Sequence, residues 1–237
     1  MSRLASLKAL MEKVSENPRN SVIDPAFFIE ISKFHTAFDN AIKVASYTKQ
    51  KEMENHSPYE NQKKKTKLYI SHFIQVLNFA ILRGELKPKV RTFYGIAQEQ
   101  TTVPPLNTDE HLLDWGQKII DGEHKRIATG GNPIYCPSIA LVKVNYNLFK
   151  EISSFQKALK DKAKHYEKEL ADIRNEANAL IRKIWEHVEK EFSHIKNTEK
   201  KIELCKEYGI VYTYRKGEKE KIRRRQELEA MNLKLSF

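Results

Sequence analysis

The chain has 237 residues, of which 40% are apolar and 31% are charged. These fractions are typical of a globular protein with room for one large domain or two small ones. Glycine and proline number only eight each, which excludes collagen-like and low-complexity architectures. No apolar run approaches the roughly 18 residues that a membrane-spanning helix needs, so we expect no membrane partner.

The first residues predict an amphipathic helix rather than a secretory signal, because Leu4, Leu7 and Leu10 recur at helical spacing without an unbroken apolar run. The two cysteines, Cys136 and Cys205, are far apart and have no CxxC partner. That spacing excludes a disulfide framework and a cysteine-rich zinc site. We therefore expect a cytoplasmic protein with two reduced thiols.

The net charge of +11 is concentrated in two zones. Residues 43–91 carry 11 basic and 4 acidic side chains, and residues 196–237 carry 12 and 7. Clustered cations can neutralise phosphates, although lysine-rich helix faces are also ordinary solvated surface. Neither zone interleaves aromatic residues as single-strand readers do. The candidate nucleic-acid-binding residues are Lys63, Lys64, Lys65, Lys67, Arg215, Lys216, Arg223, Arg224 and Arg225.

The first half of the chain predicts two consecutive helices. Asp24 and Pro25 form a cap and first turn, and apolar residues follow at helical period as far as Ala45. The run Ser57-Pro58-Tyr59-Glu60 then has the pattern of a capping box with proline at the first helical position. We expect it to begin a second helix, which ends near Gly84.

The middle section, residues 98–136, predicts a short amphipathic helix that ends before Gly130. Between Pro137 and Gly209 the chain contains no further glycine or proline, and apolar residues recur at a period of 3.6. The nearly all-charged stretch Lys160–Glu169 is compatible with a hairpin tip or with the exposed middle of one long helix.

A similarity between the two halves favours the hairpin. Each half opens at a proline, has a charged centre and ends in Tyr-Gly-Ile, at residues 94–96 and 208–210. We therefore predict an all-α helical bundle made from two duplicated helical hairpins, with a crossover that contains a short helix and a short C-terminal extended segment. Its core should bring together Phe34, Phe73, Phe155 and Ile184.

The corresponding boundaries divide one compact domain into four stretches. These are an N-terminal helix with the first hairpin at 1–97, the crossover at 98–136, the second hairpin with the extended segment at 137–215, and a basic tail at 216–237.

Three sequence runs resemble a group of uncharacterised bacterial helical proteins, many of them from Bacteroidetes. The runs are Ile70–Leu77 followed by Arg83-Gly84-Glu85, Ile184–Glu189, and Tyr208–Tyr212. The resemblance covers roughly residues 20–215 and implies a helical fold. It carries no catalytic signature, since these are packing motifs.

Arg182 and His187 are the candidate catalytic residues. They fit the R-x4-H spacing of ribonucleases of the HEPN type, which are also helical and in which Arg and His polarise the phosphate and move protons. About one such match is expected by chance in a chain of this composition. Lys183 also departs from the polar residue that usually follows the arginine.

His187, Glu191 and His194 are the candidate metal ligands, because their spacing lets them face one direction on a helix. A helical di-metal site would need a second Glu-x-x-His pair, and the nearest substitute is Asp121 with His124. We therefore expect no metal and no cofactor.

The sequence contains no G-x-S-x-G, H-E-x-x-H or Walker pattern. We accordingly predict a non-enzymatic protein that associates with itself or with another protein. Nucleic-acid binding by the two basic zones is the alternative, and a HEPN-like ribonuclease is the further one.

Overall fold

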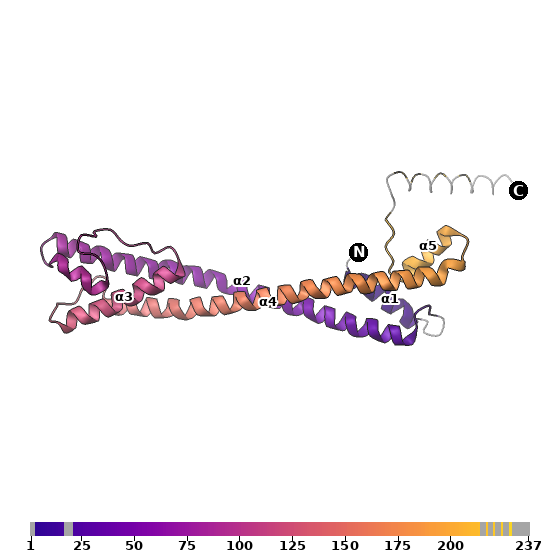
Figure 1. Ribbon diagram of the computed structural model, residues 1–237, viewed down its shortest axis with the longest axis horizontal. Coiled ribbons are helices and arrows are strands. Elements are labelled where there is room, and N and C mark those ends of the chain that lie inside the picture. Colours follow the sequence, from indigo (N-terminus) through magenta and orange to yellow (C-terminus); the bar gives the residue numbers. More distant parts are fainter. Residues whose placement is uncertain are drawn as a thin grey trace. The chain divides into compact units, whose positions relative to one another are not determined.

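The computed structural model describes residues 3–16 and 21–213, together with Gly217, Glu220, Arg224 and Leu228. This part of the chain contains helices and no strand, which confirms the all-α fold class. In chain order the helices are α1 (Arg3–Glu16), α2 (Pro25–Leu82), the 3₁₀ helix η2 (Pro88–Tyr94), α3 (Asp109–Ala128), α4 (Ile139–Glu191), the 3₁₀ helix η3 (Phe192–His194) and α5 (Thr198–Glu207) (Figure 1). None of the described helices is both long and apolar enough to cross a bilayer.

α2 begins as predicted but does not stop at Ser57. The Asp24 carboxylate accepts hydrogen bonds from the backbone N–H groups of Ala26 and Phe27, and the helix then runs unbroken to Leu82 with Pro58 inside it. The predicted second helix start is therefore wrong. A capping box is a local signal, and here the contacts of the following turns outweigh it.

Those contacts join α2 to α4. The rings of Tyr59 and Phe149 stack with centroids 6.4 Å apart. The Gln62 amide and the Thr66 hydroxyl both donate to the backbone carbonyl of Asn145, at 3.0 and 2.9 Å. They hold the helix through the turn where proline removes one backbone hydrogen bond.

α4 is also a single helix, so the predicted second hairpin is wrong and its alternative, one long helix, is what the structure has. The stretch Lys160–Glu169 lies inside α4. Its charged side chains are exposed, whereas Ala163 is buried. The charges therefore mark the solvated side of a helix and not a turn. The internal duplication stays a prediction.

The described residues fall into two compact units, named here by their place in the sequence. The central unit is Val44–Glu167, and the terminal unit combines Met1–Lys43 with Lys168–Phe237. α2 and α4 contribute to both. The predicted common core is wrong, because Phe73 is buried in the central unit, Ile184 is buried in the terminal unit and Phe155 is 55% exposed.

The central unit has its largest apolar core where three helices meet. The cluster draws on α2, η2, α3 and α4, and its fully buried large side chains include Phe73, Tyr94, Leu112 and Phe149. α3 approaches α4 closely at Gly116, where an added Cβ would lie 2.3 Å from the Tyr146 ring. Glycine is required there because any side chain would separate the two helices.

A buried ion pair fastens the end of α3 to the loop that follows it. Arg126 binds Glu123 through two parallel hydrogen bonds of 2.8 Å, and it also donates to the Asn132 carbonyl at 2.6 Å. Glu123 further accepts from the Tyr94 hydroxyl and from the Ile134 N–H. Both carboxylate oxygens of Glu123 and the Nε and Nη2 atoms of Arg126 have partners, so this network stabilises the fold.

The rest of the central unit is built differently. Between residues 44 and 58 of α2 and 152 and 167 of α4, the buried residues are small or polar: Ala45, Thr48, Gln156 and Ala163. The Asn55 amide donates to Gln156 at 2.7 Å across the two helices. This stretch has a narrow seam in place of a broad core.

The terminal unit packs α1 and α5 with the ends of α2 and α4. Leu7 and Leu10 are 1% exposed, which confirms the predicted amphipathic N-terminal helix. The predicted C-terminal extended segment is described as far as Thr213, has no regular secondary structure from Ile210 onward, and buries Ile210. The predicted basic tail, residues 216–237, lies largely outside the described residues.

Candidate functional site

A line of exposed apolar side chains runs along α4 in the central unit. Leu141, Val144, Leu148 and Phe155 are between 48% and 55% exposed, and Ile152 between them is partly buried. Their spacing of three and four residues places them along one side of the helix. We call Leu141, Val144, Leu148, Ile152 and Phe155 the α4 stripe.

The α4 stripe points outward because a second line of apolar residues on α4 packs into the core. Val142, Tyr146 and Phe149 are buried against α2 and α3. Val142 directly follows Leu141, and Phe149 directly follows Leu148. One residue turns a helix by about 100°, so the two lines occupy different sides. This part of α4 is apolar on two sides and packs on one.

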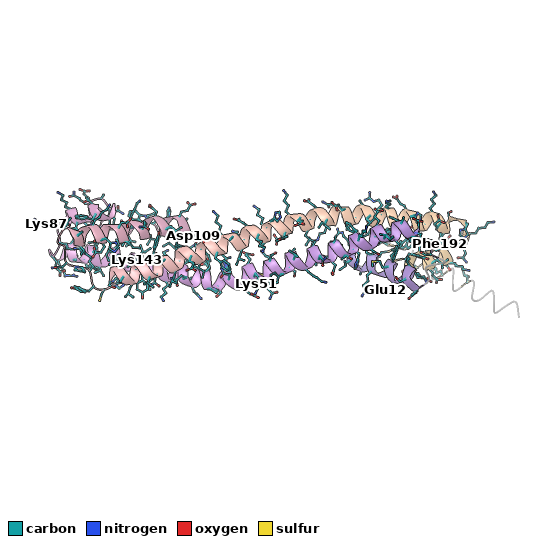
Figure 2. All side chains as sticks on the ribbon, turned by 90° about the horizontal axis from the view of Figure 1, so that it is seen from below. Glu12, Lys51, Lys87, Asp109, Lys143 and Phe192 are labelled. Atoms are coloured by element: carbon teal, nitrogen blue, oxygen red, sulfur yellow. The ribbon has the colours of Figure 1, made fainter. Side chains whose placement is uncertain are left out.

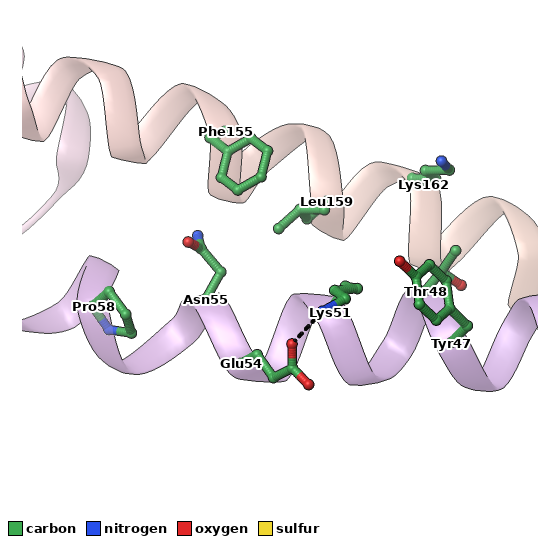
Figure 3. Close-up of a pocket in the computed structure, with 9 residues that line it drawn as sticks. All are labelled: Tyr47, Thr48, Lys51, Glu54, Asn55, Pro58, Phe155, Leu159 and Lys162. Carbon is green, nitrogen blue, oxygen red and sulfur yellow. Dashed lines mark hydrogen bonds and ion pairs between the residues drawn. The ribbon is translucent and has the colours of Figure 1, made fainter.

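A groove between α2 and α4 continues the α4 stripe. It has a volume of about 430 Å³ and is lined by Tyr47, Thr48, Lys51, Glu54, Asn55, Pro58, Phe155, Leu159 and Lys162 (Figure 3). In that view Leu159 points from α4 toward α2, and Asn55 points back toward α4. A neighbouring hollow of about 450 Å³ shares Pro58 and Phe155 with the groove and extends to Leu148.

The polar groups of the groove are largely neutralised by their neighbours. Lys51 and Glu54 form an ion pair of 2.7 Å. The hydrogen bond between them raises the pKa of Lys51 and lowers the pKa of Glu54, so both stay charged near neutral pH. The pair carries no net charge, and Lys162 is the other charged side chain of the groove.

A polar cluster sits where α3 begins, at Asp109 (Figure 2). The Asp109 carboxylate pairs with the Lys63 ammonium at 2.6 Å and accepts hydrogen bonds from the Tyr59 hydroxyl at 2.6 and 2.8 Å and from Ser153 at 3.3 Å. Burial raises the pKa of Asp109, but the hydrogen bonds from Lys63 and Tyr59 outweigh it and bring that pKa below its ordinary value. The cluster joins three helices.

The cluster occupies one of the basic residues predicted to bind nucleic acid. Burial disfavours the Lys63 ammonium, but its hydrogen bonds to Asp109 and Tyr59 prevail, and the pKa of Lys63 is raised. The Lys63 charge is thus neutralised by Asp109 within the protein. Lys67 donates to the Asn107 side chain at 3.1 Å. Lys64 and Lys65 are exposed and have no partner among the described residues.

The second basic zone is described at only one of its candidate positions. Arg224 is exposed. The other candidates, Arg215, Lys216, Arg223 and Arg225, lie outside the described residues.

Arg182 and His187 are not brought together. They are five residues apart on α4, which separates them by about 140° around the helix. Arg182 is exposed and lines a cavity with Trp185, whereas His187 Nε2 lies 2.9 Å from the Val22 carbonyl oxygen. The His187 ring also meets Phe27 edge-on, with centroids 5.9 Å apart. Within one copy these two side chains face different neighbours.

The metal candidates are separated as well. His187 contacts the Val22 carbonyl, Glu191 is exposed at the end of α4, and His194 follows in η3 with Nδ1 2.8 Å from the Glu191 carbonyl oxygen. Across the described residues, no three His, Cys, Asp or Glu side chains gather as a metal site would require.

The sequence analysis missed the α4 stripe because it assigned Phe155 to the core. The signal that could have found it is the second apolar line of Val142 and Phe149. A helix that buries one face needs only one such line, so a second line at another angle predicts a second contact surface.

Comparisons with known protein families, with curated proteins and with solved structures found no match. The resemblance to a group of bacterial helical proteins stays a prediction. Any function for this chain has to come from its own residues.

Proposed function

We propose that the protein works by self-association, with α4 of one copy packing antiparallel against α4 of a second copy. The observation that carries this proposal is the order of the α4 stripe, whose members lie at −7, −4, 0, +4 and +7 residues from Leu148. A pattern that is the same in both directions is what a two-fold, antiparallel helix pair needs.

In such a pair, centred on Leu148, every apolar side chain meets another. Leu148 meets its own copy, Leu141 meets Phe155 of the second copy, and Val144 meets Ile152. The helix ridges formed by residues three and four apart can then interdigitate. Water is removed from apolar side chains that the single chain leaves about half exposed, and this removal supplies the driving force.

The charges of this part of α4 do not oppose the pairing. Between residues 141 and 155 the charged residues are Lys143, Lys150 and Glu151. The positions opposite them are a serine, a tyrosine and an asparagine, at residues 153, 146 and 145. No like charges therefore face each other. Facing like charges would lower the affinity of the pair.

The size of the surface sets the expected affinity. The stripe extends for about 21 Å along the helix, at about 1.5 Å per residue. One helix pair of that length buries less than the roughly 1,200–2,000 Å² of a stable protein interface. We therefore expect a weak, concentration-dependent dimer with a dissociation constant of about 1–100 μM.

Sedimentation and light scattering over a concentration series test this proposal. Leu148→Glu places two like charges on the two-fold axis and should leave a monomer at all concentrations. The matched control is Leu68→Glu on α2, which removes an equally large side chain that is 63% exposed outside the stripe and should still dimerise. A wild-type chain that stays monomeric, or a control that loses the dimer equally, contradicts the proposal.

Cross-linking tests the geometry in a Cys136→Ser background, because Cys136 is an exposed thiol. Leu148→Cys should form a disulfide with its own copy. Leu141→Cys should form none alone, but it should cross-link to Phe155→Cys when the two variants are mixed. Cross-linking of Leu141→Cys to itself would instead indicate a parallel pair.

Nucleic-acid binding is a second candidate, favoured by the two free lysines at 64 and 65. If these two alone contact phosphates, the logarithm of the affinity should fall with the logarithm of salt with a slope of about −1.8. A steeper slope would mean that the basic tail also contributes. Loss of binding in the double variant Lys64→Glu, Lys65→Glu is expected, and binding that is insensitive to salt contradicts this candidate.

We place either activity in the cytoplasm. The exposed free thiol of Cys136 supports this location, because such thiols persist in reducing compartments. Fractionation of cells that express the tagged chain checks it.

A further inference from the structure

The terminal unit contains a cavity that self-association does not use. Its volume is about 540 Å³, within the range of small-molecule sites. It is formed by α1, α4 and the segment that follows α5. The lining residues are Arg3, Ser6, Asn178, Ile181, Arg182, Trp185, Val211 and Thr213.

The charged side chains that line this cavity are all positive. Two guanidinium groups line it, from Arg3 and Arg182, and none of the eight lining residues carries a carboxylate. Arg3 Nε donates to the Asn178 side chain at 2.5 Å, which fixes the head of Arg3 at the wall. Arg182 is exposed and has neither an ion-pair nor a hydrogen-bond partner among the described residues. Two unneutralised cations at one cavity attract an anion.

The remaining wall offers the other parts of a binding site. Ser6 and Thr213 carry hydroxyl groups that can donate hydrogen bonds to an anion's oxygens. Trp185 supplies an aromatic surface beside Ile181 and is only partly buried. Polar groups that converge beside an apolar surface are a feature of ligand pockets.

We propose that this cavity binds a small aromatic anion. Arg3 and Arg182 hold its phosphate or carboxylate group, because a guanidinium can donate two parallel hydrogen bonds to the oxygens of either group. Its ring lies against Trp185. The site is independent of the α4 stripe, which belongs to the central unit, so either proposal can fail without the other.

Tryptophan fluorescence of the full chain tests the binding directly. The chain has two tryptophans, so Trp115→Phe leaves Trp185 as the single reporter inside the cavity. Adenosine monophosphate and benzoate represent the phosphate and carboxylate forms of the ligand, and adenosine represents the ring without the charge. We expect a saturable change with at least one of the two anions, the tighter of which identifies the anionic group. The change should weaken as salt is added.

Variants test the two arginines. Arg182→Gln and Arg3→Gln should each weaken binding about tenfold or more, the effect of losing one charge-assisted hydrogen bond. Arg182→Lys keeps the charge without the fork and should lie between wild type and glutamine. Circular dichroism checks that each variant keeps its helices.

Lys183→Gln is the matched control, since it removes a charge from the same turn of α4. The Lys183 ammonium lies over the Phe27 ring at 4.7 Å and 3.7 Å from Glu30, so it does not line the cavity. Affinity should change less than twofold. The proposal is overturned if neither anion binds by fluorescence and calorimetry, if adenosine binds as tightly as its monophosphate, or if Lys183→Gln weakens binding as much as Arg182→Gln.

Discussion

The two ends of the central unit solve the same packing problem in different ways. At one end α2, α3 and α4 enclose a broad core that includes Phe73 and Phe149. At the other end α2 and α4 meet along a seam of small and polar residues such as Ala45 and Ala163. Two helices alone cannot enclose large side chains. The large apolar residues of this stretch therefore lie beside the seam and not within it.

That difference explains where the candidate surface lies. Tyr47 and Phe155 flank the seam and are 60% and 55% exposed. A third helix would cover them, as α3 covers the core at the other end. In the structure no described helix takes that place over the groove, and in the proposed dimer α4 of the second copy would lie against Phe155. Predictions that separate the two ends therefore also test the basis of the proposed dimer.

The largest effect is expected at the three-helix end. Glu123→Ala leaves Arg126 buried without its carboxylate and should lower the free energy of unfolding by about 3–5 kcal/mol. Urea denaturation followed by circular dichroism measures it. Glu110→Ala on the exposed side of α3 is the control and should change stability by less than about 0.5 kcal/mol.

The same network predicts a pH dependence. Burial alone would raise the pKa of Glu123, but hydrogen bonds from Arg126, Tyr94 and the Ile134 N–H outweigh it and lower the pKa below its ordinary value of 4.5. Its stabilisation is therefore complete above about pH 4.5 and is lost as the pH falls through the lowered value. The Glu123→Ala chain should lack this component of the acid slope. An identical slope in both chains would contradict the assignment.

An intermediate effect is expected at the seam. Ala163→Leu forces a larger side chain between two closely packed helices and should cost about 1–3 kcal/mol. Lys164→Leu, one residue along and exposed, is the control and should leave stability nearly unchanged. Equal stability of Ala163→Leu and wild type would mean that the seam can open, which contradicts tight packing there.

The smallest effect is a gain. Pro58→Ala restores the backbone hydrogen bond that proline removes from the interior of α2, and we expect stability to rise by about 1 kcal/mol. Ser57→Ala should be neutral here. If Ser57 instead capped a separate helix, its loss would cost about 1 kcal/mol, and Pro58→Ala would bring no gain. The pair of variants thus distinguishes one helix from two.

The fold class could be predicted because helical periodicity is recorded directly in the sequence. The 3.6-residue period from Pro137 onward indicated one straight helix, and it was the similarity between the two halves that led to the hairpin. Both errors, at Ser57 and at Lys160–Glu169, came from treating a local signal as a chain reversal. Helix continuity is decided by contacts with the neighbouring helix, which no local pattern records.

The candidate surfaces were harder to predict, for two physical reasons. An apolar side chain at helical spacing looks the same whether it faces a core or solvent, so Leu148 and Phe149 could not be told apart from periodicity alone. The cavity of the terminal unit joins Arg3 to Arg182, and residues so far apart meet only through tertiary packing. Asp109, which neutralises Lys63, is likewise distant from it in sequence.

The way the two units are divided along the sequence has a consequence for folding during synthesis on the ribosome. Val44–Glu167 is one uninterrupted piece of chain, whereas the terminal unit needs residues from before and after it. During synthesis the central unit can therefore fold while Leu7 and Leu10 of α1 still wait for their partners beyond Lys168. Until then the apolar face of α1 lacks these contacts, and a pause in translation past Glu167 would prolong its exposure to water.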